Sequence, residues 1–215
     1  MRADHRAVEP PITRAGGEPR PRRIYAKTAT RKRQIVEAAT AVFASKGYNG
    51  GSLREIATQI DVALTSLVHH FPQKIDLLQA VLEHADNVGN GPFHDNCRTH
   101  GLRYGVLDLV ERNFDHPELL RLLAVLATEC SAPDHPGHMW FVERYERSRA
   151  DFSAKFAFDQ ARGLVPASLD PADLAEGLIS VWDGAQLQWL IDPSRNRMVA
   201  MMELYLNSIG ATSVN

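Results

Sequence analysis

The apolar residues of this chain recur at intervals of three and four positions over most of its length, as on one face of an α-helix. Helical segments are predicted at about 31–46, 52–60, 63–70, 75–88, 101–114, 117–131, 137–162, 171–191 and 194–209. The alternating pattern of a β-strand does not stand out in any segment, and there is no internal repeat. The sequence therefore predicts an all-α fold of about nine helices.

Residues typical of helix ends mark several of these boundaries. Ser52 and Glu55 have the spacing of a capping box, in which the hydroxyl accepts the Glu55 amide and the carboxylate reaches back. Asp170 followed by Pro171 is a preferred order for a helix start. The polar stretch 89–100 lacks such signals, and we expect it to be a connection between helices.

Residues 1–26 have a different composition, rich in proline and arginine and poor in apolar side chains. Such a segment cannot bury enough apolar surface to offset the entropy of ordering it, so a disordered basic arm is expected there. Its cations either touch DNA, in a minor groove or at phosphates, or form a non-specific tail. The cations in question are Arg14, Arg20, Arg22, Arg23 and Lys27.

Charge is distributed unevenly along the chain. Residues 1–75 hold 13 Lys and Arg against 6 Asp and Glu, whereas residues 76–215 hold 11 against 20. A basic front on an acidic body is expected when only the front meets a polyanion. The alternative is that the cations of 1–34 only solvate a flexible tail.

The composition excludes several classes of protein. The longest uninterrupted apolar run is Leu122–Ala127, whereas a membrane span needs about 20 apolar residues. Arg2 and Arg6 are not followed by an apolar stretch, so no signal peptide is expected. Cys97 and Cys130 are too few for a disulfide scaffold, which favours the reducing cytoplasm.

Little in the sequence suggests catalysis. There is neither a Gly-rich phosphate loop nor a Gly-x-Ser-x-Gly elbow, and no cofactor is expected. His94, Cys97 and His100 are potential metal ligands, but on a helix they spread over too wide an arc for one ion. His135 and His138 could supply further ligands. An α-helical metal-dependent enzyme or binding protein that uses these residues is therefore the alternative function.

The predicted helices 52–60 and 63–70 are short and joined by a tight turn. Together with 31–46 they have the arrangement of a helix-turn-helix domain, whose second member lies in the DNA major groove. The string Arg33–Asp86 resembles the DNA-binding domain of the tetracycline-repressor-like (TetR) family of bacterial regulators. The resemblance rests on Ile35, Ala38, Ala39, Phe43, Gly47, Ser52, Ile56, Ala57, Val62, Ser66, Leu67, His70, Phe71, Lys74, Leu77 and Leu78.

The resemblance implies a DNA-binding domain over 27–74 and an effector-binding and dimerisation domain over 75–215. Because Ser52 begins a helix, its hydroxyl and the following free amides can hold a phosphate. Lys74 begins the next long helix, where its ammonium can reach the same DNA backbone, and Thr65 and His69 remain for base edges. The candidate DNA contacts are Arg31, Arg33, Ser52, Leu53, Arg54, Leu64, Thr65, Ser66, Val68, His69 and Lys74.

Two positions depart from the family pattern. Asp61 stands in the turn where the family usually has Gly, and Asp tolerates the left-handed conformation better than most residues. Val68 stands where the family usually has Tyr, which puts one phosphate contact in doubt and leaves an aliphatic group for a thymine methyl or a sugar. The resemblance also makes His70 more buried than His69.

The second half of the chain is expected to hold a small, largely apolar or aromatic effector between its helices. The polar candidates Glu129, Tyr145 and Gln186 are favoured as a set, because in apolar surroundings they would seek a partner. The alternative for each aromatic candidate is an ordinary role in the core. The candidate lining residues are Leu107, Phe114, Leu126, Glu129, Trp140, Phe141, Tyr145, Phe152, Trp182 and Gln186.

The resemblance implies a homodimer held by the last two long helices. The candidate interface residues are Ala185, Trp189, Leu190, Met198, Met201, Met202, Tyr205 and Ile209. The leading hypothesis is a homodimeric transcriptional regulator that acts as a repressor, performs no chemistry, binds a palindromic operator and is released by a small molecule. A helical adaptor with a purely structural helix-turn-helix is a further alternative.

Overall fold

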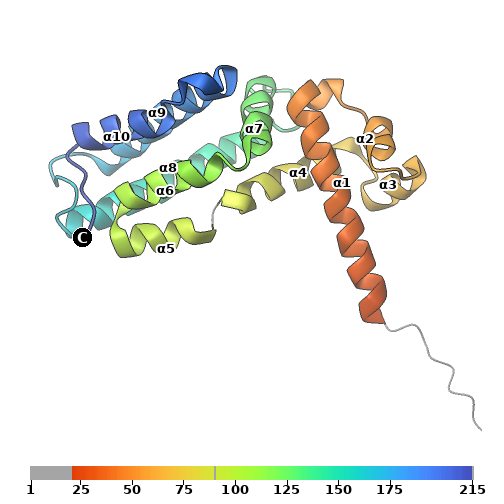
Figure 1. The fold of residues 1–215 in the computed structure, drawn as a ribbon, viewed down its shortest axis with the longest axis horizontal. Helices are drawn as coiled ribbons and strands as arrows, with labels where there is room; N and C mark the ends of the chain where they lie inside the picture. The colour runs from red at the N-terminus through yellow and green to blue at the C-terminus, as the bar shows by residue number, and fades with distance from the viewer. Residues whose placement is uncertain (1–20, 90, 215) are drawn as a thin grey trace, which may run out of the picture.

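The computed structural model describes residues 21–89 and 91–214 (Figure 1). Its elements are α1 Pro21–Gly50, α2 Leu53–Gln59, α3 Leu64–His70, α4 Lys74–Gly89, α5 Gly91–His100, α6 Leu102–Asn113, α7 Pro117–Glu129, α8 His138–Ala161, α9 Pro171–Ile191, the 3-10 turn η1 Pro193–Arg195 and α10 Met198–Ser208. The described residues contain no strand, so the predicted all-α fold is confirmed, with ten α-helices rather than nine.

The helices form a small unit at one end and a longer bundle at the other (Figure 1). Helices α1, α2 and α3 make the small unit, and α5, α6, α8, α9 and α10 make the bundle. Helices α4 and α7 lie between the two, and α10 packs along α9. Among the described residues, no helix is both long and apolar enough to cross a bilayer.

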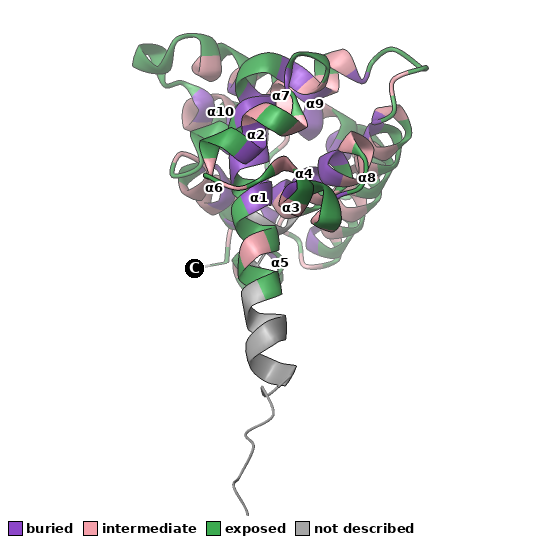
Figure 2. Cartoon of the chain, turned by 90° about the vertical axis from the view of Figure 1, so that its right-hand side faces the viewer, coloured by how far each residue is buried: buried purple, intermediate pink, exposed green. Residues whose placement is uncertain are grey.

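The first core fills the small unit and continues into the bundle (Figure 2). Phe43, Ile56 and Leu67 each have no exposed surface and hold α1, α2 and α3 together. Leu122 and Leu126 of α7 are equally buried in the same core. The packing therefore crosses the expected domain boundary at residue 74, and α7 belongs as much to the small unit as to the bundle.

The second core lies among α5, α6, α8, α9 and α10. It is built from fully buried side chains such as Phe156, Leu178 and Met202. Asp159 is also buried there, and its carboxylate accepts the backbone N–H of Leu102 at 2.6 Å. Because the first amides of a helix lack partners within it, this bond fixes the start of α6 against α8.

The polar stretch 89–100 was expected to be a connection, and this prediction is wrong, because α5 covers Gly91–His100. Phe93 and Cys97, one turn apart, are its buried residues, and two apolar positions among many polar ones give little periodic signal. A Cβ at Gly105 of α6 would overlap the Cys97 sulfur. The absence of that Cβ lets α5 pack closely on α6.

Helix α1 begins at Pro21, so it includes residues 21–26 of the expected disordered arm. Residues 1–20 and the side chains of the arm's candidate cations lie outside what the structure describes. The helix bends at Gly47, where the expected helix 31–46 was to stop. The backbone there has φ 69° and ψ 179°, a conformation almost confined to glycine.

Candidate DNA-binding surface and effector pocket

Helix α2 begins as the sequence predicts, with one difference in its cap. The Ser52 hydroxyl accepts the Glu55 backbone N–H at 3.1 Å, which confirms one half of the capping box. The Glu55 carboxylate does not reach back to Ser52 but accepts the Lys46 ammonium at 2.6 Å. The start of α2 is therefore tied to the end of α1, while Ser52 and Arg54 stay exposed to solvent.

The turn between α2 and α3 has the predicted conformation at Asp61. Its φ is +51°, the only positive value at a non-glycine residue in the described part of the chain. The following backbone N–H of Val62 donates to the Ala57 carbonyl at 3.0 Å, which closes the turn. Asp therefore performs the role expected of glycine, and α3 leaves α2 at a fixed angle.

Helix α3 has one face in the core and one in solvent. Leu67 is completely buried, whereas Thr65, Val68 and His69 are exposed, with 37% of the Val68 surface accessible. Leu64 and Ser66 are half-buried at the edges of the outer face. The three exposed side chains thus lie on the surface that a groove of DNA can reach.

His70 ends α3 and is half-buried, whereas His69 is exposed, in the order that the resemblance implied. Burial lowers the pKa of the His70 imidazole, and the nearby charges of His69, Lys32 and Arg31 lower it further. The neutral imidazole is therefore favoured in the free protein. An added negative charge in this region would favour the protonated form.

Lys74 begins α4, as predicted, but its ammonium is not free in solvent. It lies 4.4 Å from the ring centroid of Tyr48 at the end of α1. Burial lowers the Lys74 pKa, and the carboxylate of Glu129 opposes that shift. The cation is therefore held near the junction of α1, α4 and α7 in the free protein.

The remaining DNA candidates lie around this surface. Arg33 is exposed and pairs with Glu37 at 3.6 Å, and Arg31 is half-buried on the same helix. Leu53, like Leu64, packs partly against the first core. These leucines shape the surface, whereas the arginines supply charge to it.

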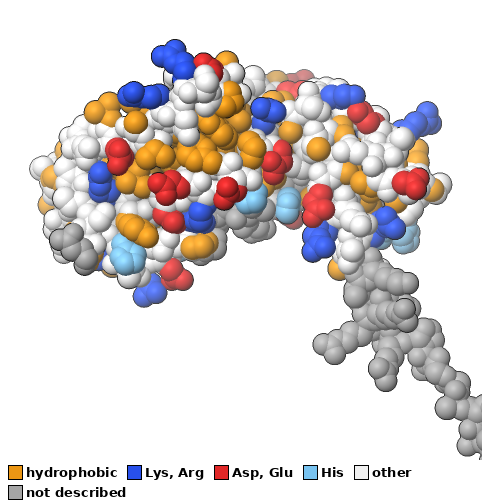
Figure 3. All heavy atoms as spheres, in the orientation of Figure 1, with side chains coloured by type: hydrophobic (Ala, Val, Ile, Leu, Met, Phe, Trp, Pro, Cys, Tyr) orange, Lys and Arg blue, Asp and Glu red, His pale blue; other side chains and the backbone are white. Residues whose placement is uncertain are grey.

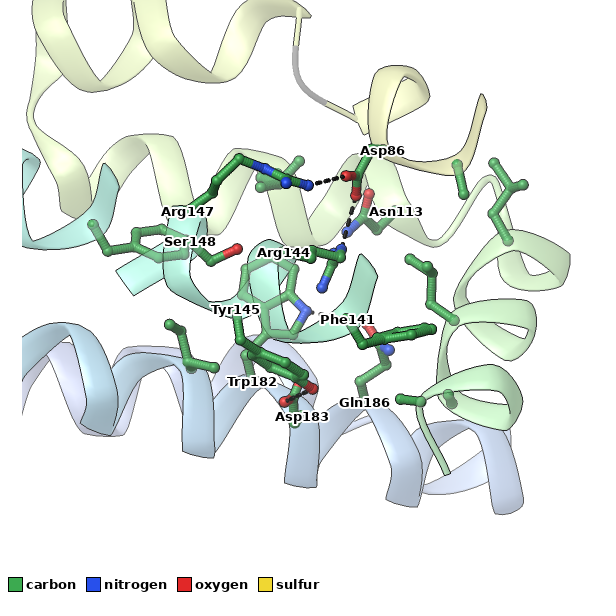
Figure 4. Close-up of a pocket in the computed structure, with 18 of the residues that line it drawn as sticks. Asp86, Asn113, Phe141, Arg144, Tyr145, Arg147, Ser148, Trp182, Asp183 and Gln186 are labelled. Atoms are coloured by element: carbon green, nitrogen blue, oxygen red, sulfur yellow. Dashed lines mark hydrogen bonds and ion pairs between the residues drawn. The ribbon is translucent and has the colours of Figure 1, made fainter. Parts of the chain in front are cut away.

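A cavity of about 560 Å³ lies between the two cores. The walls come from the end of α4, from α5, α6 and α7, and from α8 and α9 (Figure 4). Helix α7 contributes an aliphatic wall that includes Leu119, Leu123 and Ala127. A volume of this size suits a small organic molecule.

The structure brings five of the ten sequence candidates together in this cavity. They are Phe141, Tyr145, Phe152, Trp182 and Gln186.

The other five candidates lie elsewhere. Leu126 is buried in the first core, Trp140 packs against it, and Leu107 packs against the second core. Phe114 packs on Trp189 with 5.0 Å between ring centroids. Glu129 turns away from the cavity and accepts a backbone N–H of α1.

One side of the cavity is charged. Figure 4 shows Arg144 and Arg147 of α8 pointing toward Asp86 of α4. The Asp86 carboxylate is 2.8 Å from the Arg144 Nε and 3.5 Å from an Arg147 nitrogen. Arg147 also lies 3.9 Å from Glu143, so the two guanidinium groups share two carboxylates and make this side of the cavity rich in N–H donors.

The opposite side combines aromatic rings with hydrogen-bonding groups (Figure 4). The Tyr145 hydroxyl donates to Asp183 at 2.7 Å, and the Trp182 indole N–H donates to Gln186 at 3.1 Å. Burial, and then the Asp183 carboxylate, raise the Tyr145 pKa to about 12. Burial also raises the Asp183 pKa, against the effect of the Tyr145 bond and of Arg144.

Sequence reasoning did not identify the charged wall. Arg147 and Glu143 have the spacing of an ion pair within one helix and lie 3.9 Å apart, but Arg147 also reaches Asp86 on another helix. Arg149 forms its ion pair with Glu176 on α9, at 2.6 Å, and lies over the Tyr145 ring of its own helix. Spacing along one helix cannot show which faces of two helices will meet.

The potential metal ligands do not gather. Cys97 points into the second core, where burial raises its pKa to about 12, while His94 is exposed and His100 packs on Tyr104. His135 lies near Cys130 instead, with 3.1 Å between Nδ1 and the sulfur. Within the described ranges there is no group of three His, Cys, Asp or Glu residues able to hold a metal ion.

The dimer candidates divide into buried and exposed residues. Met198 and Met202 lie in the protomer's own core and offer no surface to a second copy, contrary to expectation. By contrast, Ile191 is 75% exposed and Leu204 is 61% exposed, and neither was a candidate. Figure 3 shows hydrophobic side chains gathered on the face near α9 and α10.

The remaining candidates for the dimer interface differ in their contacts and exposure. Ala185, Trp189 and Met201 line a groove of about 240 Å³ between the end of α9 and the start of α10. The Tyr205 hydroxyl donates to the Leu174 carbonyl at 2.6 Å and holds α10 on α9. Leu190 and Ile209 are half-buried.

Comparisons with known proteins agree with this arrangement. The model of the family "Bacterial regulatory proteins, tetR family" matches residues 35–81. The transcriptional activator FasR of Mycolicibacterium smegmatis is 34% identical over 105 residues, which are 48% of this chain and 47% of FasR, so the match spans about half of that relative. The transcriptional repressor BepR of Brucella suis is 25% identical over 192 residues, or 79% of this chain and 85% of BepR.

Solved structures extend the likeness through the second half of the chain. A TetR-family transcriptional regulator from Mesorhizobium loti has 25% identity and a TM-score of 0.62, covering 85% of this chain and 98% of its own. The family match falls on α1 to α4, where the Asp61 turn and the exposed face of α3 lie. Residues 35–81 therefore form a DNA-binding domain of the tetR-family type, and the chain as a whole shares its fold with TetR-family transcriptional regulators.

Proposed function

We propose that the protein is a homodimeric repressor that binds a palindromic DNA operator and releases it when a small molecule occupies the cavity. The observation that carries the proposal is the α2–α3 unit. Asp61 fixes its turn, Leu67 anchors α3, and the outer face of α3 is left free for DNA. The repressor role is supported by BepR, which is named a repressor and is matched over most of its length.

The DNA contacts are proposed to divide by chemistry. The amides at the start of α2, next to Ser52, and the cations Arg31 and Arg33 meet phosphates, because helix N-termini and guanidinium groups bind anions. Thr65 and His69 meet base edges, and Val68 packs on a thymine methyl or a sugar. Phosphate contacts set the position on DNA, and the α3 side chains set the sequence read there.

The effector is proposed to be a small, largely apolar or aromatic molecule with a polar end. The aliphatic wall of α7 and the rings of Phe141 and Trp182 favour an apolar body. The Arg144 side of the cavity favours an acceptor group on the ligand, because it holds more N–H donors than the Asp86 carboxylate can accept.

The dimer is proposed to form through α9 and α10. One helix-turn-helix presents few base contacts, so two copies reading the halves of a palindrome give the needed specificity. The exposed Ile191 of α9 and Leu204 of α10, together with the groove that Ile191 lines, provide apolar surface on these two helices.

The test is selection of DNA by the full-length protein from the sheared genome of its source. We expect a small set of enriched fragments that share an inverted repeat. A synthetic duplex of that repeat should bind more tightly than a scrambled one, with an affinity that falls steeply as salt rises. Recovery of no enriched fragment, or equal binding to both duplexes, would contradict the proposal.

A further inference from the structure

Helix α7 contacts both the cavity and the DNA-binding unit. Leu119, Leu123, Ala124 and Ala127 line the cavity. Leu122, on the opposite side of the helix, is completely buried in the first core with the residues of α1. Because protein interiors are close-packed, a ligand that pushes on one side of α7 must also disturb the packing on the other.

The last residue of α7, Glu129, makes a specific contact with α1. Its carboxylate accepts the backbone N–H of Tyr48 at 2.6 Å, across 81 positions of sequence. A hydrogen bond to a carboxylate is shorter and stronger than one between neutral groups. The contact is made at the bend of α1, since Tyr48 follows Gly47 directly.

The bend itself is shaped around this carboxylate. A Cβ at Gly47 would overlap the Glu129 side chain, so the missing side chain provides the space that the carboxylate fills. The same stretch leads into α2, whose Glu55 is bonded to Lys46 at 2.6 Å. A shift of Glu129 would therefore act on the corner from which α2 and α3 are held.

Glu129 also acts on a proposed phosphate-binding cation. The Lys74 ammonium lies 4.4 Å from the Tyr48 ring centroid, and the Glu129 carboxylate favours its charged form. Lys74 is the first residue of α4, the helix that follows the reading helix α3. The ends of α1 and α7 and the start of α4 thus meet at one carboxylate.

We propose that Glu129 is the positioning residue through which an occupied cavity weakens DNA binding, because it joins the cavity wall α7 to the Gly47–Tyr48 bend and to Lys74. This inference rests on the proposed function. It places the main connection between the cavity and the DNA-binding unit at the end of α7. The alternative connection runs through the end of α4, where Asp86 contacts Arg144 and Arg147 of α8.

The test uses a side chain as the occupant of the cavity, since no effector is identified. Ala124→Phe adds a ring on the wall of α7, and Ala127→Leu is the milder second variant. Each is combined with Glu129→Gln, which keeps the size of the side chain and a neutral acceptor oxygen but removes the charge that strengthens the Tyr48 bond and acts on Lys74. The readout is the dissociation constant for the duplex selected from the genome, measured by fluorescence anisotropy.

We expect Ala124→Phe to weaken DNA binding about tenfold in the presence of Glu129 and less than about twofold when Glu129 is Gln, in the usual range of coupling between two sites. Glu118→Gln, at the exposed start of the same helix, is the matched control and should preserve the tenfold effect. Glu129→Asp retains the charge on a side chain one methylene shorter, which loses the contact with the Tyr48 N–H, so Ala124→Phe should have less than about a twofold effect in this background as well.

Amide exchange gives an independent readout. The Tyr48 N–H should exchange with solvent faster in Ala124→Phe than in the unaltered protein. In the Glu129→Gln background, adding Ala124→Phe should leave the exchange rate of this N–H unchanged. If the cavity and Glu129 substitutions have independent effects on DNA affinity, the inference is wrong while the proposed function stands. If the unaltered protein selects no DNA, the proposed function itself fails. If Ala124→Phe does not fold, Ala127→Leu decides by the same comparison.

Discussion

At the scale of single residues, Gly47 shows how one missing side chain serves two purposes. Its backbone conformation costs other residues roughly 1–3 kcal/mol, and its empty Cβ position makes room for Glu129. We expect Gly47→Ala to lower the free energy of unfolding by more than the conformational cost alone, as measured by urea denaturation. Gly163→Ala is the control, since Gly163 also has a positive φ but has nothing within 4 Å of its Cβ position. Equal losses in the two variants would show that the Glu129 contact contributes nothing to stability.

Lys74 gives a second prediction at this scale. If its ammonium leaves Tyr48 to bind a phosphate, Lys74→Ala should weaken binding to all sequences similarly. The slope of log affinity against log salt should fall by about one, as for one lost phosphate contact. Arg98→Ala, which removes an exposed cation of α5 that pairs with Asp95, should leave the slope unchanged. If the salt slope is unchanged in Lys74→Ala, Lys74 does not contact a phosphate and serves only the packing where α1, α4 and α7 meet.

For single residues, the sequence predicts local conformation well but does not predict contacts between residues that are far apart in the chain. The left-handed turn at Asp61 could be predicted, because conformation there is a local property of the residue type. The role of Glu129 could not, since its partner Tyr48 is 81 positions away and nothing in local spacing relates the two. Half of the candidate cavity residues share this limit: an apolar residue on a helix can face the core, the cavity or another helix.

At the scale of elements, helix α3 links DNA binding to pH. The His70 pKa is lowered in the free protein by burial and by the charges of His69, Lys32 and Arg31. Nearby phosphates would offset those charges and raise the pKa, so binding DNA would take up protons. DNA affinity should therefore increase as pH falls from 8 to 6, by at most about tenfold per pH unit for one proton. The measurement is the dissociation constant as a function of pH at constant ionic strength.

The control for this prediction compares two histidines. His70→Asn should flatten the pH dependence, whereas His100→Asn, on α5 against Tyr104, should leave it unchanged. The prediction fails if His70→Asn and the unaltered protein show the same dependence. Among the α-helices of the described residues, α5 is the one for which no helix was expected, because its two buried residues, Phe93 and Cys97, depend on the close approach that Gly105 permits.

At the scale of the whole molecule, the packing places the cavity between the two cores rather than inside a separate domain. The first core runs from α1 into α7 and includes Phe141 of α8, while the second holds α6, α9 and α10. A ligand between them would touch elements of both cores, which supports the proposal that occupancy of the cavity acts on the DNA-binding unit. The sequence could suggest two halves, but it could not show that α7 is shared by both.

The assembly of two copies is the last prediction at this scale. Ile191 and Leu204 are large apolar side chains that the protomer leaves 75% and 61% exposed near the groove between α9 and α10. Across a two-fold axis each would meet the same surface of the second copy, so Ile191→Glu with Leu204→Glu would bury like charges against each other. Sedimentation at micromolar concentration should show a dimer for the unaltered protein and a monomer for the double variant, with loss of binding to the selected duplex. Met139→Glu, at a residue 60% exposed on α8, is the control and should remain dimeric. A double variant that stays dimeric and binds DNA normally would place the interface on another face of the molecule.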